Sequence, residues 1–175
     1  MTSKTILITG ASSGFGRLTA ELLAREGHTV FASMREIVGK NHGYAEGLRD
    51  QQIKVVELDV TDQTSVDRAV ESVLDQAGRI DVLVNNAGRC FHRRDRSVHS
   101  DISAAMFEHF MSAFRAPDPP NPREVAEAVS RLIAQPKGAR PVRTVVGPTF
   151  GSDTVNAQTA PVVEALGLGH LAQVA

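Results

Sequence analysis

Hydrophobic positions in the amino-terminal half of the chain follow two alternating patterns. Residues 6–8 are a short continuous apolar run, typical of a buried strand in a parallel sheet, and residues 29–33, 55–58 and 80–84 are predicted as three further strands. Between these predicted strands, apolar residues recur at helical spacing in residues 14–26, in residues 45–51 and in the segment that Gly78 ends. The alternation predicts βαβ units with right-handed crossovers. The expected fold class is α/β, a Rossmann-type doubly wound parallel sheet.

Residues at the helix ends support these boundaries. Gly27 and Gly78 stand where a helix commonly ends with a left-handed residue. Thr61 and Asp62 are both able to cap the helix that runs to Gly78, because a short oxygen-bearing side chain accepts a hydrogen bond from a free N–H group of the first turn.

The pattern changes at Arg89. Residues 89–102 are polar and basic, with the cluster His92, Arg93, Arg94, Arg96 and His99. Aromatic residues are interleaved there only at Phe91, so we expect a solvated junction loop rather than a nucleic-acid surface.

Further elements are expected after this loop. Residues 103–114 are predicted as an amphipathic helix, and Asn121 and Pro122 predict the start of another that runs to Pro136. A last strand is predicted at Pro141–Val146 and a short apolar helix after Pro161. We expect residues 1–88 to form a dinucleotide-binding half, and residues 103–175 to pack against it in the same single domain.

Composition and charge narrow the possible partners. The formal net charge is −1, so no overall field attracts nucleic acid or an anionic membrane. The single cysteine, Cys90, excludes an intramolecular disulfide and, with His92 and His99, supplies fewer than the four ligands of a structural zinc site. The first apolar stretch is too short for a signal peptide, and no apolar run approaches the length of a membrane span. We expect a cytoplasmic protein that binds no metal, membrane or nucleic acid.

A glycine-rich turn follows the first predicted strand and opens the first helix: Thr9-Gly10-Ala11-Ser12-Ser13-Gly14-Phe15-Gly16. Glycines allow a tight turn and a close approach of the backbone to a pyrophosphate. The helix N-terminus adds free N–H groups and a positive dipole end. Ser12 and Ser13 are expected to be hydroxyls of this loop, since no G-x-S-x-G motif of a serine hydrolase is present. The predicted binding residues of the turn are Gly10, Ser12, Ser13, Gly14, Phe15 and Gly16.

The spacing Thr-Gly-x-x-x-Gly-x-Gly resembles that of the short-chain dehydrogenase/reductase family, and two further motifs agree in order and distance. Asp59-Val60 follows the third strand, where the resemblance implies contact with the adenine ring. Asn85-Asn86-Ala87-Gly88 follows the fourth, where it implies a sheet support and a lining for the adenosine ribose. Asp59, Val60, Asn86, Ala87 and Gly88 therefore join the predicted cofactor-binding residues. The resemblance covers residues 4–88 and resumes at 97–171.

The residue after the second strand predicts the cofactor. An acidic side chain at the end of this strand bonds the ribose 2′-hydroxyl of NAD, whereas an arginine accepts the 2′-phosphate of NADP. Met34 stands where NAD-preferring relatives carry Asp, and Arg35 follows it. The prediction is NADP rather than NAD, with Glu36 as a neighbour that weakens phosphate binding. The alternative is a solvated Arg35 paired with Glu36.

The resemblance also shows what this chain lacks. Family members use a tyrosine and, four residues later, a lysine for proton transfer. The single tyrosine here, Tyr44, is followed at that spacing by Leu48. Roughly a hundred residues separate the corresponding segments in relatives, judged from typical βαβ lengths, whereas here residues 89–96 alone do so. No residue is predicted to be catalytic.

An internal deletion of this kind has structural consequences. It removes the two helices of the family's helix-bundle dimer, so we expect no such dimer. The fourth strand loses its neighbour and either pairs with Pro141–Val146 or stays an open edge.

Three functions remain open: a non-catalytic NADP(H)-binding pseudoenzyme, an active NADP-dependent oxidoreductase of alcohols or ketones, and a truncated product without function.

Overall fold

The computed structural model describes residues 2–88, 111–112, 114–115, 117, 119–136, 138–141, 143–148 and 152–167. Strands and helices alternate through residue 84, as the hydrophobic pattern predicts. In chain order they are β1 (Thr5–Ile8), α1 (Gly14–Arg25), β2 (Thr29–Met34), α2 (His42–Arg49), β3 (Lys54–Glu57), α3 (Gln63–Ala77) and β4 (Val82–Val84). Two later helices are α5 (Arg123–Ala134) and α6 (Ser152–Ala165).

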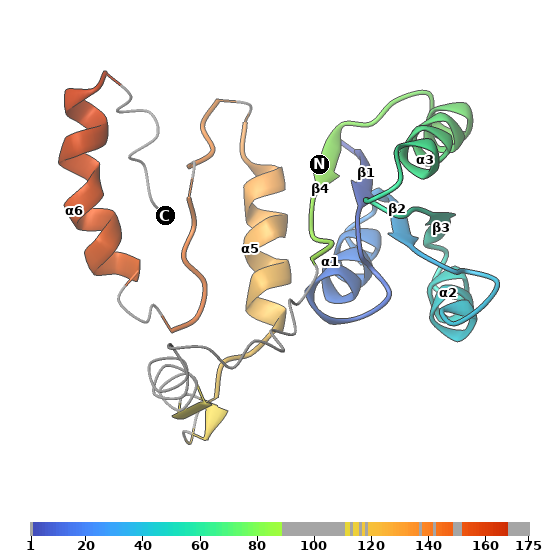
Figure 1. Ribbon diagram of the computed structural model, residues 1–175, viewed down its shortest axis with the longest axis horizontal. Helices are drawn as coiled ribbons and strands as arrows, with labels where there is room; N and C mark the ends of the chain where they lie inside the picture. The colour runs from blue at the N-terminus through green and yellow to red at the C-terminus, as the bar shows by residue number, and fades with distance from the viewer. Residues whose placement is uncertain are drawn as a thin grey trace, which may run out of the picture. The chain divides into compact units, whose positions relative to one another are not determined.

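The four strands form one parallel sheet in the order β3-β2-β1-β4 (Figure 1). The chain moves outward from β1 to β3 and then crosses to the other side of β1. The direction of winding therefore reverses between β1 and β4, which is where open α/β sheets bind ligands, beyond the carboxyl ends of the strands. The predicted Rossmann-type fold is confirmed.

Side chains alternate between two cores because successive residues of a strand point to opposite faces. On one face, Ile6 and Ile8 pack with Leu23 of α1 and Leu48 of α2. On the other face, Leu7, Phe31 and Val56 pack with Ala69 and Val73 of α3. Figure 1 shows α3 on the opposite side of the sheet from α1 and α2.

Helix α5 belongs to the first of these faces. Residues 125–134 form one compact unit with residues 1–89. Ile133 is buried in the α1-side core, and Val129 packs against it. The Ser130 hydroxyl donates to Glu26 at the end of α1, and the Lys4 ammonium donates to the Ile133 carbonyl. Asn121 accepts from the backbone N–H of Arg123 at 3.0 Å, which agrees with the predicted helix start.

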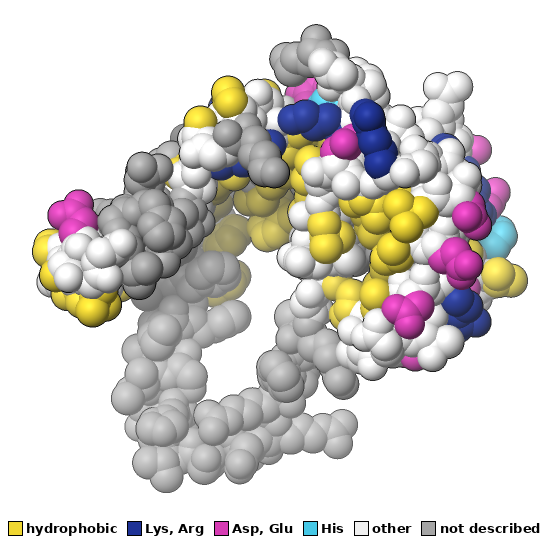
Figure 2. Space-filling view, turned by 90° about the horizontal axis from the view of Figure 1, so that it is seen from above, with side chains coloured by type: hydrophobic (Ala, Val, Ile, Leu, Met, Phe, Trp, Pro, Cys, Tyr) yellow, Lys and Arg dark blue, Asp and Glu magenta, His cyan; other side chains and the backbone are white. Residues whose placement is uncertain are grey.

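Strand β4 is an edge of the sheet over the described residues, which agrees with one of the two outcomes predicted for it. Leu7 and Leu83 share a register position, yet Leu7 is 2% exposed and Leu83 is 53% exposed. Leu74 of α3 is also exposed. Hydrophobic side chains reach the surface of the molecule between charged ones (Figure 2).

Two predictions for the second half are wrong. The described part of the segment predicted as a strand at Pro141–Val146 is not a continuous strand: Arg143 makes an isolated β-bridge, and residues 141 and 144–148 belong to no strand. Pro141 and Pro148 lack the N–H group that a ladder needs, and Gly147 turns the chain with a φ of +75°. The predicted short helix after Pro161 instead begins at Ser152, with Pro161 inside it.

Several expectations fall on residues that are not described. These are the junction loop at 89–102 with its basic cluster, the cysteine and histidines considered for zinc, and most of the helix predicted at 103–114. Residues 90–124 and 135–175 make up a second compact unit, in which Arg143 Nη1 donates to Asn156 Oδ1 of α6 at 3.1 Å. The predicted three-part division of the chain stays a prediction.

Candidate cofactor-binding site

The β1–α1 turn depends on glycine at two close contacts. Gly10 has a φ of +68°, and a Cβ there would lie 2.8 Å from Ala87 Cα. At Gly16 a Cβ would lie 2.4 Å from Asn86 Nδ2 and 2.6 Å from the Gly10 carbonyl oxygen. Any side chain at either position would push the turn away from residues 86–87. The glycines therefore hold the first turn of α1 against the segment that follows β4.

Thr9 and Asn86 join the two segments with hydrogen bonds. The Thr9 hydroxyl oxygen accepts from the backbone N–H groups of Asn86 and Ala87, each at 3.0 Å. The Asn86 amide nitrogen donates to the carbonyls of Thr9 and Gly10, each at 2.9 Å. Thr9 is 5% exposed, so these bonds are sheltered from water. Asn86 and Ala87 are thus placed beside the glycine turn.

The N-terminus of α1 has no side-chain cap. Ser13 occupies the N-cap in an extended conformation, and its side chain makes no capping hydrogen bond. The first backbone bond of the helix is long, at 3.4 Å from Arg17 N to Ser13 O. A Cβ at Gly14 would meet nothing within 4 Å, and Ser13 and Phe15 are exposed. Uncapped N–H groups beside open space suit an anion, so the chemistry of this turn fits a pyrophosphate.

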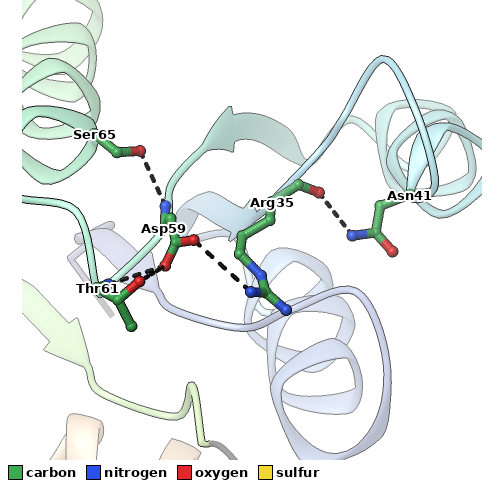
Figure 3. Close-up of polar contacts among 5 residues, drawn as sticks. All are labelled: Arg35, Asn41, Asp59, Thr61 and Ser65. Carbon is green, nitrogen blue, oxygen red and sulfur yellow. Dashed lines mark hydrogen bonds and ion pairs between the residues drawn. The ribbon is translucent and has the colours of Figure 1, made fainter.

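A second cluster forms around Asp59, where the predicted residue Arg35 lies near Thr61 and Ser65 (Figure 3). Asp59 Oδ1 accepts from the Thr61 backbone N–H at 2.9 Å and from the Thr61 hydroxyl at 2.7 Å. Asp59 Oδ2 lies 3.7 Å from Arg35 Nη1. Ser65 Oγ accepts from the Asp59 backbone N–H at 3.0 Å, which fixes the start of the turn to α3. The alternative pairing of Arg35 with Glu36 is not found; Arg35 faces Asp59 instead.

These contacts keep Asp59 ionised. The two hydrogen bonds from Thr61 are the largest cause of a pKa below the usual aspartate value, and the Arg35 guanidinium adds to it. A fixed carboxylate at the end of β3 is able to accept a hydrogen bond from an amino group, such as the one on adenine.

The loop after Arg35 is strained. Glu36 has a φ of +50°, a left-handed conformation unusual for this residue type. Its carbonyl accepts from the backbone N–H groups of Gly39 and Asn41, and the Asn41 side chain donates to the Arg35 carbonyl at 2.7 Å. The loop therefore holds the backbone of Arg35, while the Arg35 side chain stays 66% exposed.

The remaining predicted residues lie at the same end of the sheet. Val60 is 49% exposed beside Asp59, Ser12 is half-buried in the glycine turn, and Gly88 is exposed after Ala87. The structure thus forms two clusters: the glycine turn with residues 86–87, and Arg35 with Asp59.

Sequence reasoning missed three contributors. Thr9 was recognised only as part of the motif, although a polar residue at the end of a buried strand marks a candidate hydrogen-bond partner. Ser65 and Arg68 line a cavity with Arg35 and Asp59. They are one helical turn apart on α3, and only the fold shows that this turn faces the end of β2.

Tyr44 lies on α2 and is 47% exposed. Among the described residues, no helix is long and apolar enough to cross a membrane, and no three His, Cys, Asp or Glu side chains are grouped to hold a metal.

Comparison with known proteins gives consistent matches. A family model described as short chain dehydrogenase matches residues 4–114. The chain is 43% identical over 91 residues to 3-ketodihydrosphingosine reductase of Bacteroides thetaiotaomicron, covering 50% of this chain and 29% of that protein. It is 47% identical over 87 residues to 3-oxoacyl-[acyl-carrier-protein] reductase FabG of Thermotoga maritima, covering 49% of this chain and 35% of that protein. The chain thus spans about a third of the length of these relatives.

A solved structure of similar length matches over nearly the whole chain. It is a short-chain dehydrogenase from Streptomyces avermitilis, 19% identical, with a TM-score of 0.61, covering 96% of this chain and 98% of that one. At this identity the match supports the fold alone.

Proposed function

We propose that this chain, which belongs to the short-chain dehydrogenase family, binds NADP(H) without catalysing turnover. The observation that carries the binding is the uncapped glycine turn at α1, tied to Asn86 and Ala87 through Thr9. The pyrophosphate is assigned to this turn, and the adenine ring to Asp59 and Val60. The adenosine ribose is assigned to residues 86–88. When bound, the cofactor supplies a hydride donor or acceptor.

The preference for NADP rests on Arg35. Its guanidinium is mostly exposed and lies 3.7 Å from Asp59, too far for a tight hydrogen bond. A ribose 2′-phosphate offers a dianionic partner with geometry suited to the planar guanidinium. Glu36 lines the same cavity and weakens this preference.

The lack of turnover follows from the residues present. Hydride transfer to a carbonyl requires a positioned proton donor. In this family that donor is a tyrosine with a lysine four residues later. Tyr44 is the only tyrosine of the chain, and Leu48 stands four residues after it. With no such pair, the chain offers neither an acid to the carbonyl oxygen nor a lysine to hold the nicotinamide ribose.

The alternative is an active NADP-dependent oxidoreductase of an alcohol or ketone. It is favoured by the names of the two relatives, both reductases. A single series of measurements decides between the two. The purified protein is titrated with NADPH and with NADH while the nicotinamide fluorescence is followed, and is then assayed with a panel of carbonyl compounds.

We expect saturable binding, tighter for NADPH, and no turnover. Arg35→Ala is expected to remove the preference for NADPH and leave NADH binding unchanged. Steady reduction of any carbonyl would refute the pseudoenzyme proposal. Absence of binding in a cooperatively folded sample would refute the assignment of the glycine turn.

A further inference from the structure

A cavity of about 490 Å³ lies at the end of the sheet beside Arg35. Its walls come from the end of β2, from β3, and from the first two turns of α3. Val56 and Ala69 contribute apolar surface, whereas six lining side chains are charged: Arg35, Arg68, Glu36, Glu57, Asp59 and Asp62. The cavity therefore combines a small apolar area with an unequal set of charges, four carboxylates to two guanidiniums.

This balance makes a single arginine a poor receptor for a phosphate. A phosphate monoester carries about −1.5 to −2 charges near neutral pH. Arg35 already shares its charge with Asp59 at 3.7 Å. Two of the carboxylates have partners within the turn, Asp59 with Thr61 and Asp62 with the Thr64 backbone N–H. Glu36 and Glu57 are exposed and oppose a bound anion.

Arg68 supplies the second positive charge. It follows Ser65 by one turn on α3, and Ser65 and Ala69 line the same cavity. The Arg68 Nε donates to the Thr64 carbonyl of its own helix at 3.3 Å. Over residues 2–88 no carboxylate lies within ion-pair distance of it, unlike Arg17, Arg35, Arg49 and Arg79. Its terminal nitrogens are therefore able to turn to a ligand at little cost.

We propose that Arg68 on α3 is the second guanidinium for the 2′-phosphate, so that NADP specificity is set from α3 as well as from the end of β2. This inference rests on the proposed function, since it assumes an adenosine phosphate at this end of the sheet. Arg35 and Arg68 approach the phosphate from different walls of the cavity. Together the two guanidiniums offset the negative charge of the surrounding carboxylates. One guanidinium alone does not.

The test compares two nucleotides that differ only in the 2′-phosphate, adenosine 2′,5′-bisphosphate and 5′-AMP, by calorimetric titration. Arg68→Gln is expected to weaken binding of the bisphosphate by about five- to tenfold, as expected for one charge-assisted contact. The same variant should bind 5′-AMP within about twofold of the wild type, because that nucleotide lacks the group that Arg68 contacts. Arg68→Lys, which keeps the charge, should recover part of the loss.

Arg25→Gln is the matched control. Arg25 is an exposed arginine in the last turn of α1 and does not line the cavity, so this variant should bind both nucleotides like the wild type. Wild-type bisphosphate affinity in Arg68→Gln, with the preference over 5′-AMP intact, would overturn the role of Arg68 and leave the proposed function standing. A wild type that binds neither nucleotide would overturn the proposed function itself.

Discussion

Two strand-to-helix turns lie at the carboxyl end of the sheet, and they differ in how the N-terminus of the following helix is capped. In the β3–α3 turn, Asp62 caps the helix by accepting from Thr64 N at 3.0 Å, and Asp59 accepts twice from Thr61. In the β1–α1 turn, Ser13 stands at the N-cap with no capping bond. The N-terminus of α3 is therefore capped by the carboxylate of Asp62, whereas the N–H groups of the first turn of α1 are available to a ligand.

The difference arises from residue type. An aspartate at an N-cap supplies both an acceptor and a negative charge, so the helix end has little to offer an anion. Glycines at 10, 14 and 16 supply neither, but they permit positive φ angles and close backbone contacts. The self-capped turn contributes stability, and the glycine turn keeps a site for ligand binding. Variants that exchange these properties test this interpretation.

The largest effect is expected for Gly16→Ala. Its Cβ would lie within 2.6 Å of the backbone carbonyl of Gly10 and closer still to the Asn86 amide, so the turn must shift. We expect a loss of about 3 kcal/mol in the free energy of unfolding and loss of NADPH binding. Urea denaturation and cofactor titration measure the two effects.

Gly43→Ala is the control. Gly43 lies in α2, and a Cβ added there would meet nothing within 4 Å, so the variant should gain about 0.5–1 kcal/mol from helix propensity. If Gly16→Ala bound NADPH like the wild type, the close packing of the turn would have no bearing on the ligand.

A smaller effect is expected for Thr9→Val. The substitution keeps the shape but removes the oxygen that accepts from the N–H groups of Asn86 and Ala87. The Ala87 N–H then loses its acceptor, while the Asn86 N–H keeps the Val84 carbonyl at 3.0 Å, so the change should cost about 1–2 kcal/mol and weaken nucleotide binding. Thr9→Ser retains the hydroxyl and should lose less than half as much. Equal losses in the two variants would show that the methyl group, not the hydroxyl, matters.

The sequence was sufficient for the parts of the fold that depend on local pattern. The alternation of apolar runs predicts the strands and helices through β4, because each buried element carries its own periodicity. The glycine spacing places the first turn. The strand predicted at Pro141–Val146 is reduced to an isolated bridge at Arg143, because a longer ladder needs several paired residues in register. An apolar run between two prolines does not reveal how many of its residues find a pairing partner.

Contacts between distant elements could not be predicted. Thr61 and Asp62 were equal candidates for the cap of α3; the structure uses Asp62, while Thr61 binds Asp59. The alternative pairing of Arg35 with its neighbour Glu36 was plausible in sequence, but Asp59, from the turn after β3, takes that place. Arg68 reaches the cavity only because α3 crosses next to the end of β2.

The helix caps provide a direct comparison of the two turns. Asp62→Ala should cost about 1 kcal/mol in unfolding free energy, because Thr64 N loses its acceptor. Ser13→Ala should cost close to nothing, because Ser13 makes no capping bond. The affinity for 5′-AMP should respond in the opposite way. Ser13→Ala should weaken 5′-AMP binding, and Asp62→Ala should leave it unchanged. Equal destabilisation by the two variants would contradict the distinction between the turns.

The smallest effect concerns acid stability at the β3–α3 turn. The pKa of Asp59 is lowered in the folded protein, first by the hydrogen bonds from Thr61 and then by Arg35. The folded state therefore binds a proton less readily than the unfolded chain, in which an aspartate titrates at about 3.9. The stabilisation from Asp59 is present above that pH and is lost as the pH falls through the lower, folded value. The Asp59→Asn variant has no carboxylate at this position and therefore lacks this pH-dependent stabilisation. Urea denaturation between about pH 5 and pH 3 should show the wild type losing more stability than Asp59→Asn, and parallel losses would mean that the Thr61 contacts contribute no charge-dependent stability.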